Sequence, residues 1–179
     1  MRSTVLLIFL LKNKGLINLI TSLGYTHLCM KKIIKFFRPI LIAGARTWWY
    51  ITRPTTSGAK TVIRCGNEIL LIKTTYGYTY SLPGGGIKKD EQPEDAAKRE
   101  AFEEVGIRLS NVAPLPPFVT YEEYKKDTVY GFYSEVFSKE YTLDFLEIDV
   151  AEWHPLHNLP QVGSVTQKII DLYRDATQS

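Results

Sequence analysis

Residues 85–107 read GGIKKDEQPEDAAKREAFEEVGI and form the most informative stretch of the chain. Glycines and a polar turn come first, and residues typical of a helix follow. Pro93 suits the first turn of a helix, because its missing N–H has no helical partner at that position. Gly106 suits a helix C-terminus, where the backbone often turns left-handed. The stretch therefore predicts a loop, a helix over residues 93–105 and a second loop.

Three glutamates share one face of this predicted helix. Glu100, Glu103 and Glu104 have i, i+3, i+4 spacing, which places their side chains side by side. Neighbouring like charges on a helix repel by roughly 0.2–0.5 kcal/mol per pair, and a hard divalent cation with a preference for oxygen ligands relieves that repulsion. From spacing alone two interpretations stay open, a magnesium site and a solvated acidic surface.

The fixed positions of the stretch resemble the Nudix box. The matching residues are Gly85, Glu91, Arg99, Glu100, Glu103, Glu104, Gly106 and Ile107, with Ala101 as a small residue in a hydrophobic position. The flanks are similar to the family too: residues 82–86 look like the usual entry to the box, and residues 147–160 look like its closing strand. The resemblance covers about residues 57–175.

This resemblance implies an α/β Nudix fold, in which a mixed β-sheet is sandwiched between α-helices in an α/β/α arrangement. It also implies the site. Mg²⁺, with Mn²⁺ as a substitute, would be bound by Glu100, Glu103, Glu104 and the carbonyl of Gly85. Glu91 and Arg99 would pair and hold the loop against the helix, and the glycines Gly84, Gly85 and Gly86 would contact the substrate. The residues expected to carry catalysis are Glu103, Glu100, Arg99 and Glu91.

The activity implied by the resemblance is Mg²⁺-dependent hydrolysis of a diphosphate linkage in a nucleoside diphosphate-X substrate, by attack of water on phosphorus. Two alternatives are an RNA 5′-end pyrophosphohydrolase and an inactive Nudix-fold binding module. An inactive module would normally have lost a box glutamate, and none is lost here. The general base is left open among Glu103, Glu100, Glu122, Glu123 and Glu147.

The substrate-selective residues are expected outside the box. Aromatic candidates for base stacking are Tyr76 to Tyr80, Tyr121 to Tyr124, Tyr130 and Phe132, and most of them are also compatible with ordinary strand and surface positions. The net charge of +3 is too small to favour nucleic-acid binding. A small nucleotide-like molecule is therefore the expected partner.

Short apolar runs around the box predict the rest of the domain. Strands are expected over residues 59–64 and 68–73, joined by a turn at Cys65-Gly66-Asn67, and then over 78–82, 128–138 and 150–154. A last helix is expected over 163–176. Cys29 and Cys65 form no metal-ligand pair and no disulfide framework, which is typical of reduced thiols in a cytoplasmic protein.

Residues 1–56 differ in character from residues 57–179, and we interpret them as an arm ahead of the hydrolase domain. The arm is apolar and basic, it has no acidic residue, and its apolar runs are too short to span a bilayer. As a helical arm it would either lie on anionic lipid or pack on the domain or on a second subunit of a homodimer. Met30, just before Lys31-Lys32, is an alternative start to Met1.

Deletion of residues 1–50 distinguishes these two roles. We expect packing, because residues 46–54 run directly into the first predicted strand. The truncated protein should then lose thermal stability or change its oligomeric state, as measured by calorimetry and light scattering. Full-length protein that pellets with anionic vesicles at low salt, and not with neutral vesicles, would instead support peripheral membrane association.

Overall fold

The computed structural model describes residues 50–75, 78–143 and 147–178, together with Phe36, Ala43, Gly44, Thr47 and Trp48. The described residues between Phe36 and Thr52 are helical, but most of the predicted arm lies outside the described residues. Within the described part of the chain, no helix has the length and apolar character needed to cross a bilayer.

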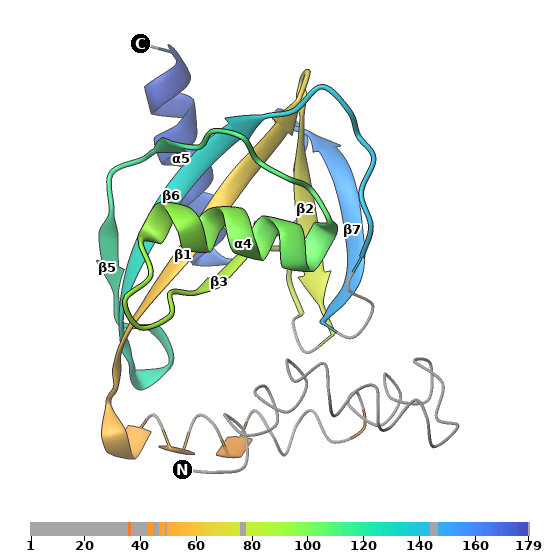
Figure 1. Cartoon of the computed structure of the whole chain (residues 1–179). Helices are drawn as coiled ribbons and strands as arrows, with labels where there is room; N and C mark the ends of the chain where they lie inside the picture. The colour runs from red at the N-terminus through yellow and green to blue at the C-terminus, as the bar shows by residue number, and fades with distance from the viewer. Residues whose placement is uncertain are drawn as a thin grey trace, which may run out of the picture.

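A mixed β-sheet forms the centre of the domain (Figure 1). Its main path runs β4-β6-β1-β2-β7, while β3 pairs with β1 and β5 pairs with β6. The strands are β1 (Thr55–Cys65), β2 (Glu68–Thr74), β3 (Gly84–Gly86), β4 (Ala113–Pro114), β5 (Phe118–Thr120), β6 (Lys126–Glu135) and β7 (Ile148–Pro155). β1 and β6 are parallel and stay in register from Thr55↔Lys126 to Arg64↔Glu135. The other pairings are antiparallel.

Two helices cover the two faces of the sheet, which gives the predicted α/β/α arrangement (Figure 1). The helix α4 (Pro93–Val105) packs on one apolar cluster through Ala96, Ala97 and Ala101. The helix α5 (Ser164–Gln178) packs on a second cluster through Ile169, Ile170 and Tyr173. Successive side chains of a strand point to opposite faces of the sheet, so neighbouring strand residues belong to different clusters. Leu70 and Ile72 accordingly face α4, whereas Ile69 and Leu71 face α5.

The prediction of a strand over residues 78–82 was wrong. In this segment the structure has only isolated bridges, at Tyr80 and Ser81, and the strand lies instead at the three glycines, which were expected to form a loop. The glycines form a strand because β1 is long. Its C-terminal end pairs with β2, and residues 58–60 nearer its start pair with β3. The short strands β4 and β5 and the 3₁₀ helix η1 (Glu122–Tyr124) were not predicted at all.

Gly84 is required by this pairing. Its φ of 144° is strained for a residue with a side chain, and a Cβ there would lie 2.1 Å from the carbonyl oxygen of Ala59. We therefore expect Gly84→Ala to lower the free energy of unfolding by about 2–3 kcal/mol in a denaturant titration. Gly86→Ala is the matched control, since a Cβ at Gly86 has no atom within 4 Å. Equal stability of the two variants would contradict this reading of β3.

Candidate active site

The position of α4 follows from small residues on its buried face. Pro93 stands at the start of the helix as predicted, and Gly106 ends it with a φ of 69°. Ala96, Ala97 and Ala101 are fully buried against the sheet. Because these side chains are small, the helix axis comes close to the strands, and the two glutamates on the same face are buried with them. Glu100 is 1% exposed and Glu104 is 3% exposed.

Arg99 connects the loop before α4 to the helix. Its guanidinium donates to both carboxylate oxygens of Glu91, at 2.6 and 2.9 Å, and to the carbonyl of Gly86 at 3.1 Å. The same group reaches Glu100 at 2.6 Å and Glu103 at 3.1 Å. Hydrogen bonding to Arg99 lowers the pKa of Glu91 to about 2, and bonding to Glu91 raises the pKa of Arg99. The pairing expected between Glu91 and Arg99 is present.

The carboxylate of Glu104 lies at the start of β3. It accepts a hydrogen bond from the backbone N–H of Gly84 at 2.8 Å. Burial raises the pKa of Glu104 above its ordinary value, while the charge of Lys60 and the Gly84 bond act in the opposite direction. Glu147 and Glu100 add to the increase, so both carboxylates lie near Glu104.

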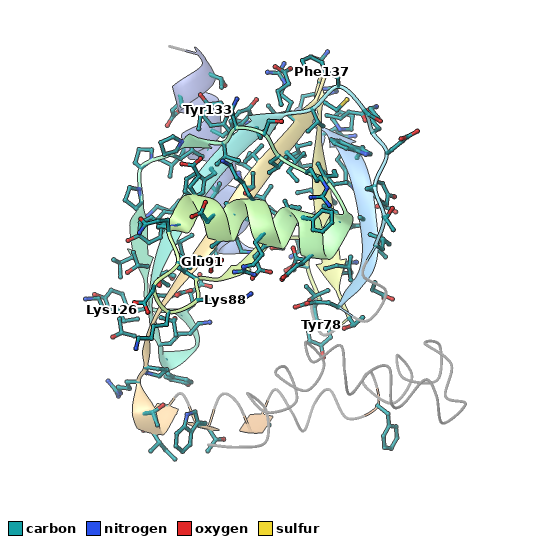
Figure 2. All side chains as sticks on the ribbon, in the orientation of Figure 1. Tyr78, Lys88, Glu91, Lys126, Tyr133 and Phe137 are labelled. Atoms are coloured by element: carbon teal, nitrogen blue, oxygen red, sulfur yellow. The ribbon has the colours of Figure 1, made fainter. Side chains whose placement is uncertain are left out.

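Gly85 leaves room for the carboxylate of Glu100. A Cβ at Gly85 would lie 2.7 Å from the Cδ and Oε1 atoms of Glu100, closer than real Cβ contacts come. The missing side chain therefore makes a cradle for this carboxylate. Glu103 lies further out: its side chain is 41% exposed, and one of its oxygens is 4.0 Å from the ammonium of Lys88. Figure 2 shows Lys88 and Glu91 below α4, on the loop that precedes the helix.

The donor set around Gly85 fits a hard divalent cation. Burial of two carboxylates is unfavourable unless positive charge compensates them, and oxygen ligands of this kind suit Mg²⁺. As they stand, no three His, Cys, Asp or Glu side chains within the described ranges are gathered closely enough to hold an ion. Instead, Arg99 pairs with Glu100 and Glu103, and the N–H of Gly84 pairs with Glu104. Ion binding would require these carboxylates to exchange partners.

Several other candidates lie apart from this cluster. Glu122 accepts a hydrogen bond from Ser164, and the side chain of Glu123 is outside the described residues. Phe132 is 5% exposed and belongs to the core under α4, against which Tyr130 also packs. Phe132 is therefore not on the surface for base stacking, and Tyr130 is only partly exposed.

The exposed aromatic candidates are Tyr78, Tyr121 and Tyr124, which are 74%, 73% and 50% exposed. Tyr78 lies at the same end of the sheet as Lys88, whereas Tyr133 and Phe137 lie at the other end (Figure 2). Tyr124 has a partner before the first strand: its ring meets that of Tyr50 edge to face, with 5.1 Å between the centroids. Tyr76 is outside the described residues.

Lys60 is a charged residue of the site that the sequence reasoning did not identify. It lies on β1 opposite Gly84. Burial lowers the pKa of Lys60, and the negative charges of Glu104 and Glu100 act in the opposite direction. The residues around Lys60 in the sequence did distinguish it. Lys60 is the one charged residue between Thr55 and Ile63 in a run that otherwise reads as a buried strand.

Comparison with known proteins agrees with the motif. A family model described as NUDIX domain matches residues 54–175, more than half of the chain. The chain therefore belongs to the NUDIX domain family, and its class is that of the Nudix hydrolases.

Curated relatives include a NAD-capped RNA hydrolase NudC from Haemophilus influenzae, 32% identical over 119 residues. Another protein of that name, from Pseudomonas putida, is 30% identical over 120 residues. Both matches cover 60% of this chain but only 44% and 40% of the relatives, so the chain spans less than half the length of these curated relatives.

Solved structures with the same fold include a MutT NUDIX hydrolase from Burkholderia pseudomallei, with a TM-score of 0.61 and 25% identity. That match covers 66% of this chain and 97% of the other. An Ap4A hydrolase from C. elegans has a TM-score of 0.59 at 18% identity, covering 69% of this chain and 98% of the other. At this identity, the similarity to the Ap4A hydrolase shows the fold alone.

The link between Glu91 and Arg99 predicts a pH-dependent stability. The pKa of Glu91 is lowered, so its stabilisation is present above its ordinary pKa of 4.5 and is lost as the pH falls towards about 2. We expect Glu91→Gln to lower the free energy of unfolding by about 1–3 kcal/mol at pH 7, with the difference from wild type vanishing near pH 2.

Glu94→Gln is the matched control for this measurement. Glu94 pairs with Lys98 one turn along the helix, but its side chain is 53% exposed, and such pairs contribute about 0.3–0.5 kcal/mol. A pH-independent loss of stability in Glu91→Gln, or a loss no larger than that of Glu94→Gln, would show that Arg99 does not fix the loop to the helix.

Proposed function

We propose that the chain hydrolyses the diphosphate linkage of a nucleoside diphosphate-X compound in a Mg²⁺-dependent reaction. The observation that carries the proposal is the pair of buried carboxylates, Glu100 and Glu104, beside a glycine segment without side chains. A bound diphosphate would lie at the glycines, and a divalent cation would add positive charge at the carboxylates to that which Arg99 supplies.

Glu100, Glu103 and Glu104, with the carbonyl of Gly85, would hold the ion. Mg²⁺ in such a site neutralises phosphate oxygens and lowers the pKa of bound water. The other tasks belong to the chain. Arg99 and Glu91 keep the glycine segment and α4 in a fixed relation, so that the carboxylates and the phosphate contacts stay aligned.

A general base must accept the proton of the attacking water. Of the acids considered outside the box, Glu147 is favoured, because its charge reaches Glu104 and raises the pKa of that residue. The backbone carbonyl of Glu147 accepts a hydrogen bond from the N–H of Thr75 at 2.9 Å, which ties this position to the end of β2. Glu122 is less suited, since its carboxylate accepts a hydrogen bond from Ser164 at the start of α5.

A dinucleotide such as NAD is the first substrate to test, because the curated relatives are named as NAD-capped RNA hydrolases. Capped or triphosphate-ended RNA is the second candidate. Against RNA, all 19 acidic residues of the chain lie after residue 56, so the domain itself repels a long polyanion. A salt series separates the two, since RNA hydrolysis should weaken steeply with salt and NAD hydrolysis only slightly.

Substitution of the box glutamates tests the proposal. The assay is release of nucleoside monophosphate from NAD, an ADP-sugar, a dinucleoside polyphosphate and RNA, with Mg²⁺ or Mn²⁺. We expect Glu103→Gln and Glu104→Gln to reduce kcat by at least about a hundredfold, because charge stabilisation in the transition state depends on the ion they hold. EDTA should abolish turnover.

The control is Glu135→Gln, which changes an exposed carboxylate at the far end of β6 and should keep full activity. Both box variants should remain folded, since each removes a negative charge from a crowded face. Turnover close to wild type in both would refute the assignment of the metal site.

A further inference from the structure

Lys60 lies at the centre of β1, within the proposed active site but outside the box. In the pairing of β1 with β3 it stands opposite Gly84. Its neighbours along the strand, Ala59 and Thr61, are fully buried, whereas Lys60 is partly buried and, by alternation, shares the α5 face of the sheet with Val62. A lysine at such a position loses hydration, and the loss is unfavourable unless hydrogen bonds or opposite charges compensate it.

The compensation that Lys60 receives is incomplete. Its Nζ donates to the hydroxyl of Ser81 at 2.8 Å and to the carbonyl of Leu82 at 3.2 Å, and both acceptors are neutral. An ammonium has three N–H donors. Within the described ranges of the chain, no third protein acceptor and no carboxylate pairs with this ammonium, so its third N–H is left for water or a ligand.

The charges around Lys60 come from three elements. Glu104 and Glu100 on α4 and Asp127 on β6 raise its pKa, and Lys125 just before β6 lowers it. Desolvation is the largest influence and lowers the pKa of Lys60 overall. The ammonium is therefore near several anions without being neutralised by any one of them.

Arg99 is the contrasting cation. Its N–H groups go to the carboxylates of Glu91, Glu100 and Glu103 and to one backbone carbonyl, so little of its charge is left for a ligand. Lys88 is a third cation, on the loop of the box, but its side chain is 62% exposed. Of these three cations, Lys60 is the one that is partly buried and has no carboxylate partner within ion-pair distance among the described residues.

Lys60 and Glu104 both form hydrogen bonds with the backbone of residues 82–84. Lys60 donates to the carbonyl of Leu82, and Glu104 accepts from the N–H of Gly84 two residues later. The ammonium and the acidic cluster thus flank the glycines where a diphosphate is expected.

We propose that Lys60 is a substrate-binding residue whose third N–H donates to a phosphoryl oxygen of the bound diphosphate. This inference rests on the proposed function for the class of ligand. The chemistry recognised is a diphosphate group, whatever is attached to it. The alternative is that Lys60 acts only as a positioning residue, which holds Leu82 and offsets the charge of the glutamates.

The test measures binding of imidodiphosphate, a diphosphate analogue with a nitrogen bridge, to the full chain in the presence of Mg²⁺ by calorimetry. We expect Lys60→Met to weaken this binding at least about tenfold, and Lys60→Arg to restore most of it, because the charge is regained. Ser81→Ala is the matched control: it removes one acceptor of Lys60 but keeps the ammonium, and it should bind the analogue as wild type does.

Binding of Mn²⁺ alone, followed by electron paramagnetic resonance, separates the two roles. A substrate-binding Lys60 predicts that Lys60→Met binds Mn²⁺ at least as tightly as wild type, since a nearby positive charge has been removed. Weaker Mn²⁺ binding together with unchanged imidodiphosphate binding would assign Lys60 to positioning and overturn the proposal. If Lys60→Met does not fold, Lys60→Gln, which keeps a donor, takes its place, with the same tenfold loss expected.

The outcomes also separate this inference from the proposed function. Imidodiphosphate binding needs no turnover, so a chain that hydrolyses none of the panel but loses analogue binding in Lys60→Met supports the lysine assignment and refutes the activity. A chain that hydrolyses NAD while Lys60→Met binds the analogue as wild type does supports the activity and refutes the lysine assignment.

Discussion

The burial of two carboxylates against a β-sheet is the constraint on which this structure depends. Glu100 and Glu104 are almost fully enclosed, and buried anions must be compensated. Each compensating group comes from a different part of the chain: Arg99 from the helix itself, the N–H of Gly84 from β3, and the charge of Lys60 from β1. The loop, the helix and the central strand are thus held together by the charges that the site needs for its chemistry.

Local signals predicted the helix that carries the site. Pro93 and Gly106 mark its two ends, and the observed limits, Pro93–Val105, are those expected. The strand at Gly84–Gly86 could not be predicted in this way, because glycine has little preference for a strand, and the pairing arises where β1 extends beyond its pairing with β2. Strands β4 and β5 were missed for a related reason: they are two and three residues long and exist through their pairing with β6.

Within the site, the link from Glu91 to Arg99 was foreseen from resemblance, and the structure contains it. The small Ala101, an imperfect match to the motif, is explained by close packing of α4 on the sheet. Lys60 could not be assigned from sequence, because the direction of a strand side chain relative to a distant helix depends on register. For the same reason Phe132 stood among the aromatic candidates for base stacking, although it belongs to the core.

The parallel pairing of β1 with β6 has a consequence for how the chain folds. Each residue of β1 from Thr55 to Arg64 pairs with a residue 71 positions later, so this contact closes a long loop that contains the whole box. Such non-local pairing forms slowly compared with hairpins and helices. During synthesis, the helix and the β1–β2 hairpin can form early, but β1 keeps an open edge until Lys126 and the residues after it have emerged. The helix that carries the three glutamates can therefore form before the sheet beneath it is complete.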